Sequence, residues 1–207
     1  MSIVKLSKLG ICGVISLLSY LAMVLFSPLA YPGYDWMSMA VSELSAVGAP
    51  SRELAAQLNS LFGPCALVSV MAVCVAIANC EVKKVRLGVY FFAAMEWMCA
   101  VGYQCFPWVS EADGVCFQNV MHLVITAVVV LLSIASLILI GVGTAKTKWK
   151  SLGIWAFICL FAMFAGAIGS NVLPKSMFGI AERVSTFSAV VFNAVLGMYL
   201  FLKKFDN

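Results

Sequence analysis

Long apolar segments separated by short polar ones run along almost the whole chain. Six of them are long enough to cross a membrane, since a helix needs about 20 residues to span the hydrocarbon core. They lie near residues 10–30, 58–79, 86–106, 118–141, 151–172 and 184–202. Helices are expected because open strands cannot satisfy their backbone in lipid. The pattern predicts an all-α polytopic membrane protein, with one domain over residues 1–207 built as a bundle of six transmembrane helices.

The most patterned connection is the polar stretch at residues 35–59, which holds three of the nine acidic residues, Asp35, Glu43 and Glu53. Its apolar positions recur at helical spacing, at Met37, Val41, Leu44 and Val47. This spacing predicts a short amphipathic helix on the membrane surface in the first outer loop. Pro50 can open the following helix, where the missing N–H costs nothing.

The composition agrees with a membrane protein. The chain is 63% hydrophobic and 11% charged, far less charged than a soluble domain of 207 residues. The net charge of +4 does not indicate nucleic-acid binding, because the basic residues lie in short loops between apolar segments. We therefore expect membrane lipids as partners, and no nucleic acid.

The basic residues also predict the orientation. Ten of the 13 fall on the side of the two termini: Lys5, Lys8, Lys83, Lys84, Arg86, Lys146, Lys148, Lys150, Lys203 and Lys204. Only Arg52, Lys175 and Arg183 fall on the other side. Because short cytoplasmic loops are enriched in Lys and Arg, both termini are predicted to be cytoplasmic in a cell-membrane protein.

Proline and cysteine positions give two further expectations. Pro64 lies early in the second segment and should kink that helix by freeing the carbonyl of Ser60. Cys105 and Cys116 flank the second outer loop, where an oxidising compartment would allow a disulfide; two unpaired thiols are the alternative. Most of the other cysteines lie inside apolar segments, as small packing residues do.

Two polar residues lie deep inside apolar segments. Glu96 is near the middle of the third segment, where an ionisable group is expensive, so we expect it to face protein and to have a polar partner such as Asn193. In the sixth segment, Glu182, Thr186, Ala189 and Asn193 form a stripe on one helix face. The alternative for this stripe is ordinary helix packing through small and hydrogen-bonding residues.

The only histidine, His122, begins the fourth segment near the outer surface. It can move a proton, or it can simply bond to a loop carbonyl. A metal site is not expected, because no second histidine and no ligand-spaced pair exists. The chain has no phosphate-binding loop, dinucleotide fingerprint, HExxH or nucleophile elbow, and we expect no cofactor.

Several short motifs resemble a known family. They are Tyr34-Asp35-Trp36, Ala40-Val41-Ser42-Glu43-Leu44, Gly48-Ala49-Pro50, Asn59 with Phe62, Phe106-Pro107, His122, and Gly179-Ile180-Ala181-Glu182-Arg183. The pattern is similar to the six-span prokaryotic membrane proteins of domain of unknown function 998. Members usually have Ser-Asp-Leu-Gly where this chain has Ser42-Glu43-Leu44-Ser45, which changes the local turn. A fainter likeness is to the eukaryotic six-span family implicated in autophagy and lipid-anchor remodelling. Neither resemblance implies a defined reaction.

Three functions compete. The first is the binding or processing of a lipid in a polar pocket at the extracytoplasmic face, with Glu43, His122 and Glu182 as acid–base candidates. Its candidate binding residues are Ser42, Asn59, Arg183, Glu96 and Asn193. Arg183 suits a phosphate or carboxylate head group. The second is a structural or sensor protein without catalysis, and the third a small-solute transporter. For the first we expect Glu43, His122, Glu182 and Arg183 to meet under the first outer loop, with Glu182 pointing inward.

Overall fold

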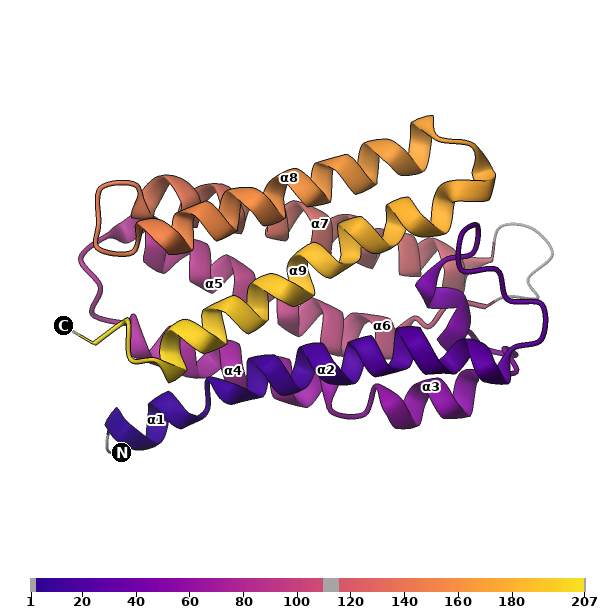
Figure 1. Ribbon diagram of the computed structural model, residues 1–207, viewed down its shortest axis with the longest axis horizontal. Helices are drawn as coiled ribbons and strands as arrows, with labels where there is room; N and C mark the ends of the chain where they lie inside the picture. Colours follow the sequence, from indigo (N-terminus) through magenta and orange to yellow (C-terminus); the bar gives the residue numbers. More distant parts are fainter. Residues whose placement is uncertain (1–2, 110–115, 207) are drawn as a thin grey trace.

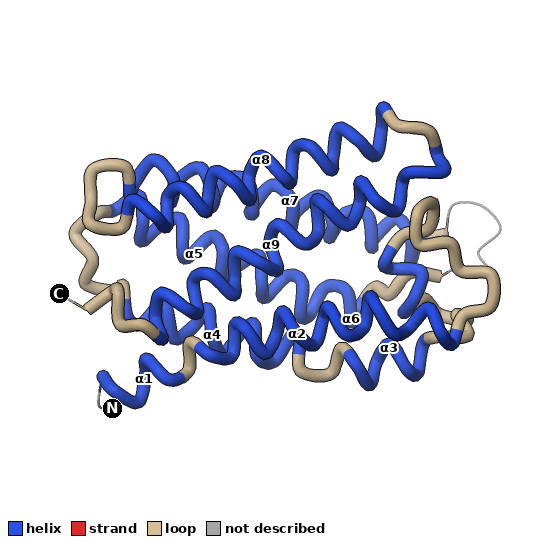
Figure 2. Tube along the Cα trace, viewed as in Figure 1, coloured by secondary structure: helices blue, strands red, loops and turns tan. Residues whose placement is uncertain are grey.

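The computed structural model describes residues 3–109 and 116–206, and every one of the six apolar segments forms a helix in it. The described residues contain helices and loops but no strand (Figure 2). The helical stretches long and apolar enough to cross a membrane are Leu6–Ala30, Arg52–Ala76, Lys83–Cys105, Phe117–Thr144, Lys150–Val172 and Lys175–Phe201. The predicted all-α, six-span architecture is confirmed.

The helices follow one another as labelled in Figure 1. Their bounds are α1 (Ile3–Lys8), α2 (Ile11–Phe26), α3 (Arg52–Leu58), α4 (Phe62–Ala76), α5 (Lys83–Trp97), α6 (Tyr103–Cys105), α7 (Phe117–Thr144), α8 (Lys150–Val172) and α9 (Phe178–Phe201). A π-helical segment, Met98–Gly102, joins α5 to α6, and short 3₁₀ helices lie at Ser27–Ala30, Val41–Ser45 and Lys175–Met177.

Helix α9 organises the bundle. It lies between α2 and α8 and also packs on α4 (Figure 1). Its Phe192 meets Phe92 of α5 edge to face, with ring centroids 5.3 Å apart, and neither side chain is exposed. The two chain termini lie at one end of the bundle, together with the α4–α5 and α7–α8 loops (Figure 1). The outer polar residues considered below lie at the opposite end.

The contact between α2 and α9 depends on glycine. A Cβ added at Gly197 would lie 2.3 Å from the carbonyl oxygen of Gly10, and one at Gly13 would lie 2.9 Å from the carbonyl oxygen of Asn193. Both neighbours are backbone atoms, which cannot move aside. Small residues let membrane helices approach to backbone contact in this way.

The second span is interrupted, and α2 compensates for the interruption. Helix α3 ends at Leu58 and α4 begins at Phe62, so the break precedes Pro64. Pro64 therefore lies in the first turn of α4, where its missing N–H has no helical partner to lose. Ser19 donates to the carbonyl of Leu58 (2.6 Å), and Ser16 to that of Phe62 (2.9 Å). The predicted kink is in fact a short interruption of the helix at residues 59–61, and serines of the neighbouring helix bond to carbonyls on both sides of it.

The amphipathic helix expected in the first outer loop is a single 3₁₀ helix, Val41–Ser45. Val41 and Leu44 form its buried side, with 4% and 0% of their surface exposed. Met37, by contrast, is exposed and lies outside it. The helical spacing therefore correctly predicted the buried side at Val41 and Leu44, but the helix is shorter than the pattern indicated.

The sixth span begins earlier than predicted, because α9 starts at Phe178 instead of near residue 184. Glu182 and Arg183 therefore lie in the second turn of α9. Their side chains meet the first outer loop, which folds over this end of the helix.

Candidate functional site

Arg183 fastens the first outer loop to α9. One guanidinium nitrogen, Nη1, donates to the carbonyl oxygens of Trp36 (2.8 Å), Met39 (3.0 Å) and Gly179 (2.8 Å). The other, Nη2, donates to the hydroxyl of Tyr34. A rigid planar cation suits such convergent oxygen acceptors. The sequence suggested Arg183 for a phosphate or carboxylate head group, whereas in the structure it bonds to the loop at Trp36, Met39 and Tyr34.

Gly179 allows the loop to lie directly on the helix. A Cβ at this position would be 2.4 Å from the carbonyl oxygen of Met39 and 2.6 Å from that of Trp36. These are two of the carbonyls that Arg183 binds. The glycine of the Gly179–Arg183 motif therefore makes room for the loop, and the arginine holds it there.

Both glutamates of the outer cluster accept from the loop backbone. The carboxylate of Glu182 accepts from the N–H of Val41, and that of Glu43 from the N–H of Ala40, each at 3.2 Å. These N–H groups belong to the start of the 3₁₀ helix and would otherwise lack partners. Glu182 points toward the loop, as the stripe on its helix indicated. The two acids act together as caps.

Two ionisable groups of this loop lie outside the spans and are perturbed. Burial raises the pKa of Tyr34, while the nearby Arg183 cation opposes this effect. The hydroxyl of Ser38 and the N–H of Met37 bond to Asp35 and lower the pKa of its carboxyl. Tyr34 also donates to the carbonyl of Ala40 (2.9 Å), so the neutral phenol has a role in the loop.

His122 serves the second outer loop. Its Nδ1 lies 2.9 Å from the carbonyl oxygen of Phe106, so Nδ1 carries the proton and donates. The ring packs against Tyr103 and Trp108, with centroids 4.9 and 5.6 Å away. No hydrogen bond within the described residues joins His122 to Glu43, Glu182 or Arg183. The structure thus brings Glu43, Glu182 and Arg183 together at the first outer loop. His122 bonds to a loop carbonyl, which was the alternative interpretation of this residue.

Asn119 of α7 holds the second outer loop beside the first, and it was not selected as a site residue from the sequence. Its side chain accepts from the N–H of Val109 (2.9 Å) and donates to the carbonyl of the same residue (3.1 Å). The adjacent Trp108 carbonyl accepts from Val47 of the first loop (2.8 Å). The sequence places Asn119 on the same helix face as His122, but it does not indicate that Val109 is the partner of Asn119.

The remaining outer candidates have structural contacts. Ser42 is half-buried in the 3₁₀ helix, and its carbonyl accepts from the hydroxyl of Ser45 (3.4 Å). Asn59 lies at the break between α3 and α4, where its carbonyl accepts from the N–H of Phe62 (3.0 Å). Its Oδ1 atom is buried without a partner in the described part of the chain.

The expected partnership of Glu96 is confirmed. Asn193 donates from Nδ2 to Oε1 of Glu96 at 2.9 Å, and the two side chains are only 2% and 5% exposed. Tyr103, two turns further along the same span, donates to Thr126 of α7 (3.1 Å). The cost of an ionisable group in lipid correctly predicted that Glu96 would face protein.

The expected disulfide is wrong. Cys105 and Cys116 are both free thiols. The sulfur of Cys116 instead accepts from the N–H of Asn119 at the start of α7, and the carbonyl of Cys105 accepts from Gln118. Sequence proximity to one loop does not align two side chains. The acids of that loop, Glu111 and Asp113, lie outside the described residues.

Residues 14–199 match the family described as "Protein of unknown function (DUF998)". The chain belongs to this family. The match confirms the resemblance seen in the short motifs; the fainter eukaryotic likeness is not addressed by it. No curated protein and no solved structure matches the chain.

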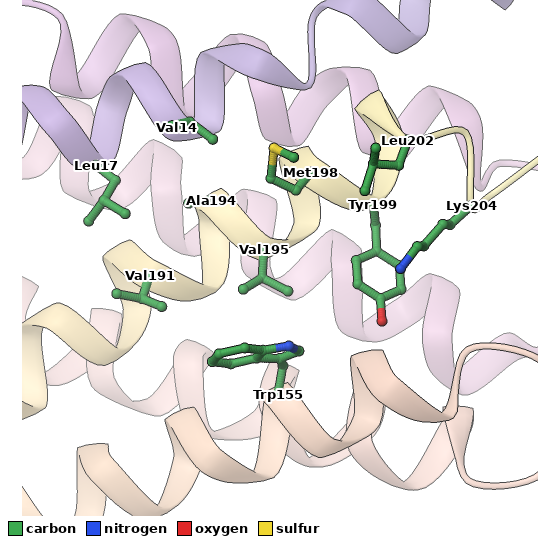
Figure 3. Close-up of a pocket in the computed structure, with 10 residues that line it drawn as sticks. All are labelled: Val14, Leu17, Trp155, Val191, Ala194, Val195, Met198, Tyr199, Leu202 and Lys204. Carbon is green, nitrogen blue, oxygen red and sulfur yellow. The ribbon is translucent and has the colours of Figure 1, made fainter.

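In this DUF998 protein an apolar groove lies on the side of the bundle, away from the outer polar cluster. It is an open depression of about 360 Å³ between α2, α8 and α9 (Figure 3). Its floor is formed by Val191, Ala194, Val195, Met198 and Tyr199 of α9 and by Leu202, which follows that helix. Val14 and Leu17 of α2 form one wall and Trp155 of α8 the other (Figure 3). The groove exists because α9 holds α2 and α8 apart.

One end of the groove is cationic. The Nζ atom of Lys204 lies 4.6 Å from the centroid of the Tyr199 ring (Figure 3). The Lys204 backbone is held in place, since its N–H donates to Tyr199 (2.9 Å) and its carbonyl accepts from the Trp149 indole (2.7 Å). No acidic side chain in residues 3–109 or 116–206 forms an ion pair with Lys204. Nor do those residues contain three His, Cys, Asp or Glu side chains placed to hold a metal.

Proposed function

We propose that this DUF998 protein binds an anionic phospholipid in the groove between α2, α8 and α9. The observation that carries this proposal is the pairing of an apolar groove with a lysine at its end. The lining is almost entirely apolar, and its volume falls at the lower end of the ~300–1,000 Å³ typical of small-molecule sites. An acyl chain fits the groove, and an acidic head group fits Lys204.

The head group supplies the selectivity. Apolar side chains gain little by exchanging one lipid tail for another, because lipid is as apolar as they are. Basic residues between transmembrane helices on the cytoplasmic side, by contrast, bind acidic head groups. Lys204 has no competing carboxylate in the described residues, and its backbone is fixed by two hydrogen bonds. The expected discrimination is therefore between acidic and zwitterionic lipids.

The positive-inside rule supports a cytoplasmic position for this end of the bundle, since ten of the 13 basic residues lie there. The bound lipid would then belong to the inner leaflet of a prokaryotic cell membrane. This proposed site differs from the extracytoplasmic polar pocket suggested by the sequence, because it is apolar and lies at the other end of the bundle. Arg183, Glu182 and Glu43 are weaker candidates for a ligand, because their polar atoms already bond to the first outer loop.

A structural role is the second candidate, and it is favoured for the outer cluster alone. There, side chains of α9 and of the loop itself satisfy the loop backbone at Trp36, Met39, Ala40 and Val41. This arrangement would fix the loop whether or not a lipid occupies the groove.

The test compares phospholipids retained by purified protein, measured by native mass spectrometry after exchange into vesicles of phosphatidylglycerol and phosphatidylethanolamine. K204Q should lower the preference for phosphatidylglycerol about fivefold, because one lysine near a membrane contributes about 1 kcal/mol. K83Q removes the same charge at the same end, on an exposed residue outside the groove, and should change nothing. V195F, which fills the groove, should reduce retention of both lipids. An equal lipid ratio in wild type, K204Q and K83Q would refute the proposal.

A further inference from the structure

The buried pair of Glu96 and Asn193 leaves one atom without a partner. Asn193 donates from Nδ2 to Glu96, but its Oδ1 is buried and accepts no hydrogen bond from the described residues. An unsatisfied buried acceptor costs about 1–3 kcal/mol. Asn193 is 2% exposed and lies well inside the sixth span, so bulk water does not reach this oxygen. Oδ1 of Asn193 therefore needs a hydrogen-bond donor.

Glu96 itself can provide that donor. An ionised carboxylate only accepts, whereas a protonated one has an O–H group that donates. A carboxylic acid and a primary amide can form two hydrogen bonds in a ring: the amide N–H donates to one carboxyl oxygen, and the acid O–H donates to the amide oxygen. The first of these bonds is present at 2.9 Å. The second would satisfy Oδ1 of Asn193.

The surroundings favour the neutral acid. Cys99, one turn further along the same span, is the titratable side chain that interacts electrostatically with Glu96. Helix α9 contributes Asn193 to its environment, and no charged side chain of α4, α7 or α9 in the described part of the chain interacts with it. A negative charge would therefore be buried in the membrane with a single amide donor and no cation, which is strongly unfavourable.

We infer that Glu96 and Asn193 form a proton-binding site in the membrane interior, in which the Glu96 proton is donated to Oδ1 of Asn193. The bound proton joins α5 to α9 through two hydrogen bonds. Loss of the proton would place a carboxylate against the amide oxygen and break one of them. The π-helical segment Met98–Gly102 begins two residues after Glu96, and such segments often accompany functional sites. This inference does not depend on the lipid groove.

Infrared difference spectroscopy of wild type minus E96Q tests the inference directly. At neutral pH the difference should contain the carbonyl-stretch band of a protonated carboxylic acid, shifted down in D₂O, and no carboxylate bands. E53Q makes the same chemical change at an exposed residue and should leave that band in place. Carboxylate bands in the E96Q difference would overturn the inference.

A second variant tests the ring itself. N193L removes both hydrogen-bonding groups at similar size, so the acid band should move to higher frequency. An unchanged band position would show that Asn193 does not receive the proton. A stability profile gives an independent measurement: wild type should lose stability as alkaline pH removes the proton, whereas the glutamine of E96Q, which can donate at any pH, should not. Parallel profiles for the two proteins would also contradict the site.

Discussion

Replacing Arg183 by alanine should release the first outer loop. The substitution removes the donors to the carbonyls of Trp36 and Met39 and to the hydroxyl of Tyr34, on a loop more than 140 residues away in sequence. It also removes the donor to the carbonyl of Gly179 in α9 itself. Hydrogen bonds to charged groups contribute about 1.5–3 kcal/mol each. They are not additive here, because Arg183 is partly exposed and water can hydrate the freed carbonyls. We therefore expect the loop to lose about 3 kcal/mol of local stability.

Hydrogen exchange followed by mass spectrometry measures this loss. A change of about 3 kcal/mol corresponds to exchange on the order of 100-fold faster. The effect should be confined to residues 36–47, with α5 and α7 unaffected. R52A is the matched control, because Arg52 lies at the same end, is exposed, and makes no side-chain hydrogen bond within the described residues. R183K should be intermediate, since an ammonium cannot reproduce the planar fork.

If R183A exchanges like wild type in residues 36–47, the arginine does not hold the loop. If R183A instead leaves the loop intact but changes lipid retention, Arg183 binds a ligand and its carbonyl contacts are secondary. Equal effects of R183A and R52A would show that charge at this end, and not the bonding geometry, is responsible.

Three other predictions concern packing, pH and orientation. G197L should prevent folding, or cost several kcal/mol, because its Cβ alone would lie 2.3 Å from the Gly10 carbonyl oxygen; a fluorescence-detected size-exclusion profile like that of wild type would contradict this. Because burial raises the pKa of Tyr34, the folded loop favours the neutral phenol, so its contribution is complete below the unfolded value of about 10 and is lost as pH rises beyond it. Above that pH, limited proteolysis of the loop should accelerate in wild type but not in Y34F. In a background in which serine replaces the eight native cysteines, S45C and K146C should be labelled by an impermeant maleimide from opposite sides of the membrane, S45C from outside intact cells. The reverse pattern would invert the proposed topology.

The features that depend on one segment at a time could be predicted from the sequence. The number of spans follows from the length of apolar segments, because each must match the thickness of the bilayer wherever its neighbours lie. The burial and pairing of Glu96 followed in the same way, since lipid penalises an exposed carboxyl whichever helix provides the partner. Val41 and Leu44 were recognised as a buried face because helical spacing is a local property.

Features that depend on how helices cross were decided by the tertiary structure alone. At the interruption of residues 59–61, Ser19 of α2 reaches the carbonyl of Leu58 at the end of α3, and Ser16 reaches that of Phe62 at the start of α4. The groove arises because α9 separates α2 from α8. Cys105 and Cys116 are not bonded to each other although they flank one loop, and Arg183 bonds to Trp36 and Met39 although 144 or more residues separate them. Hydropathy is a property of position along the chain, whereas these contacts depend on the distance and angle between helices, which hydropathy does not contain.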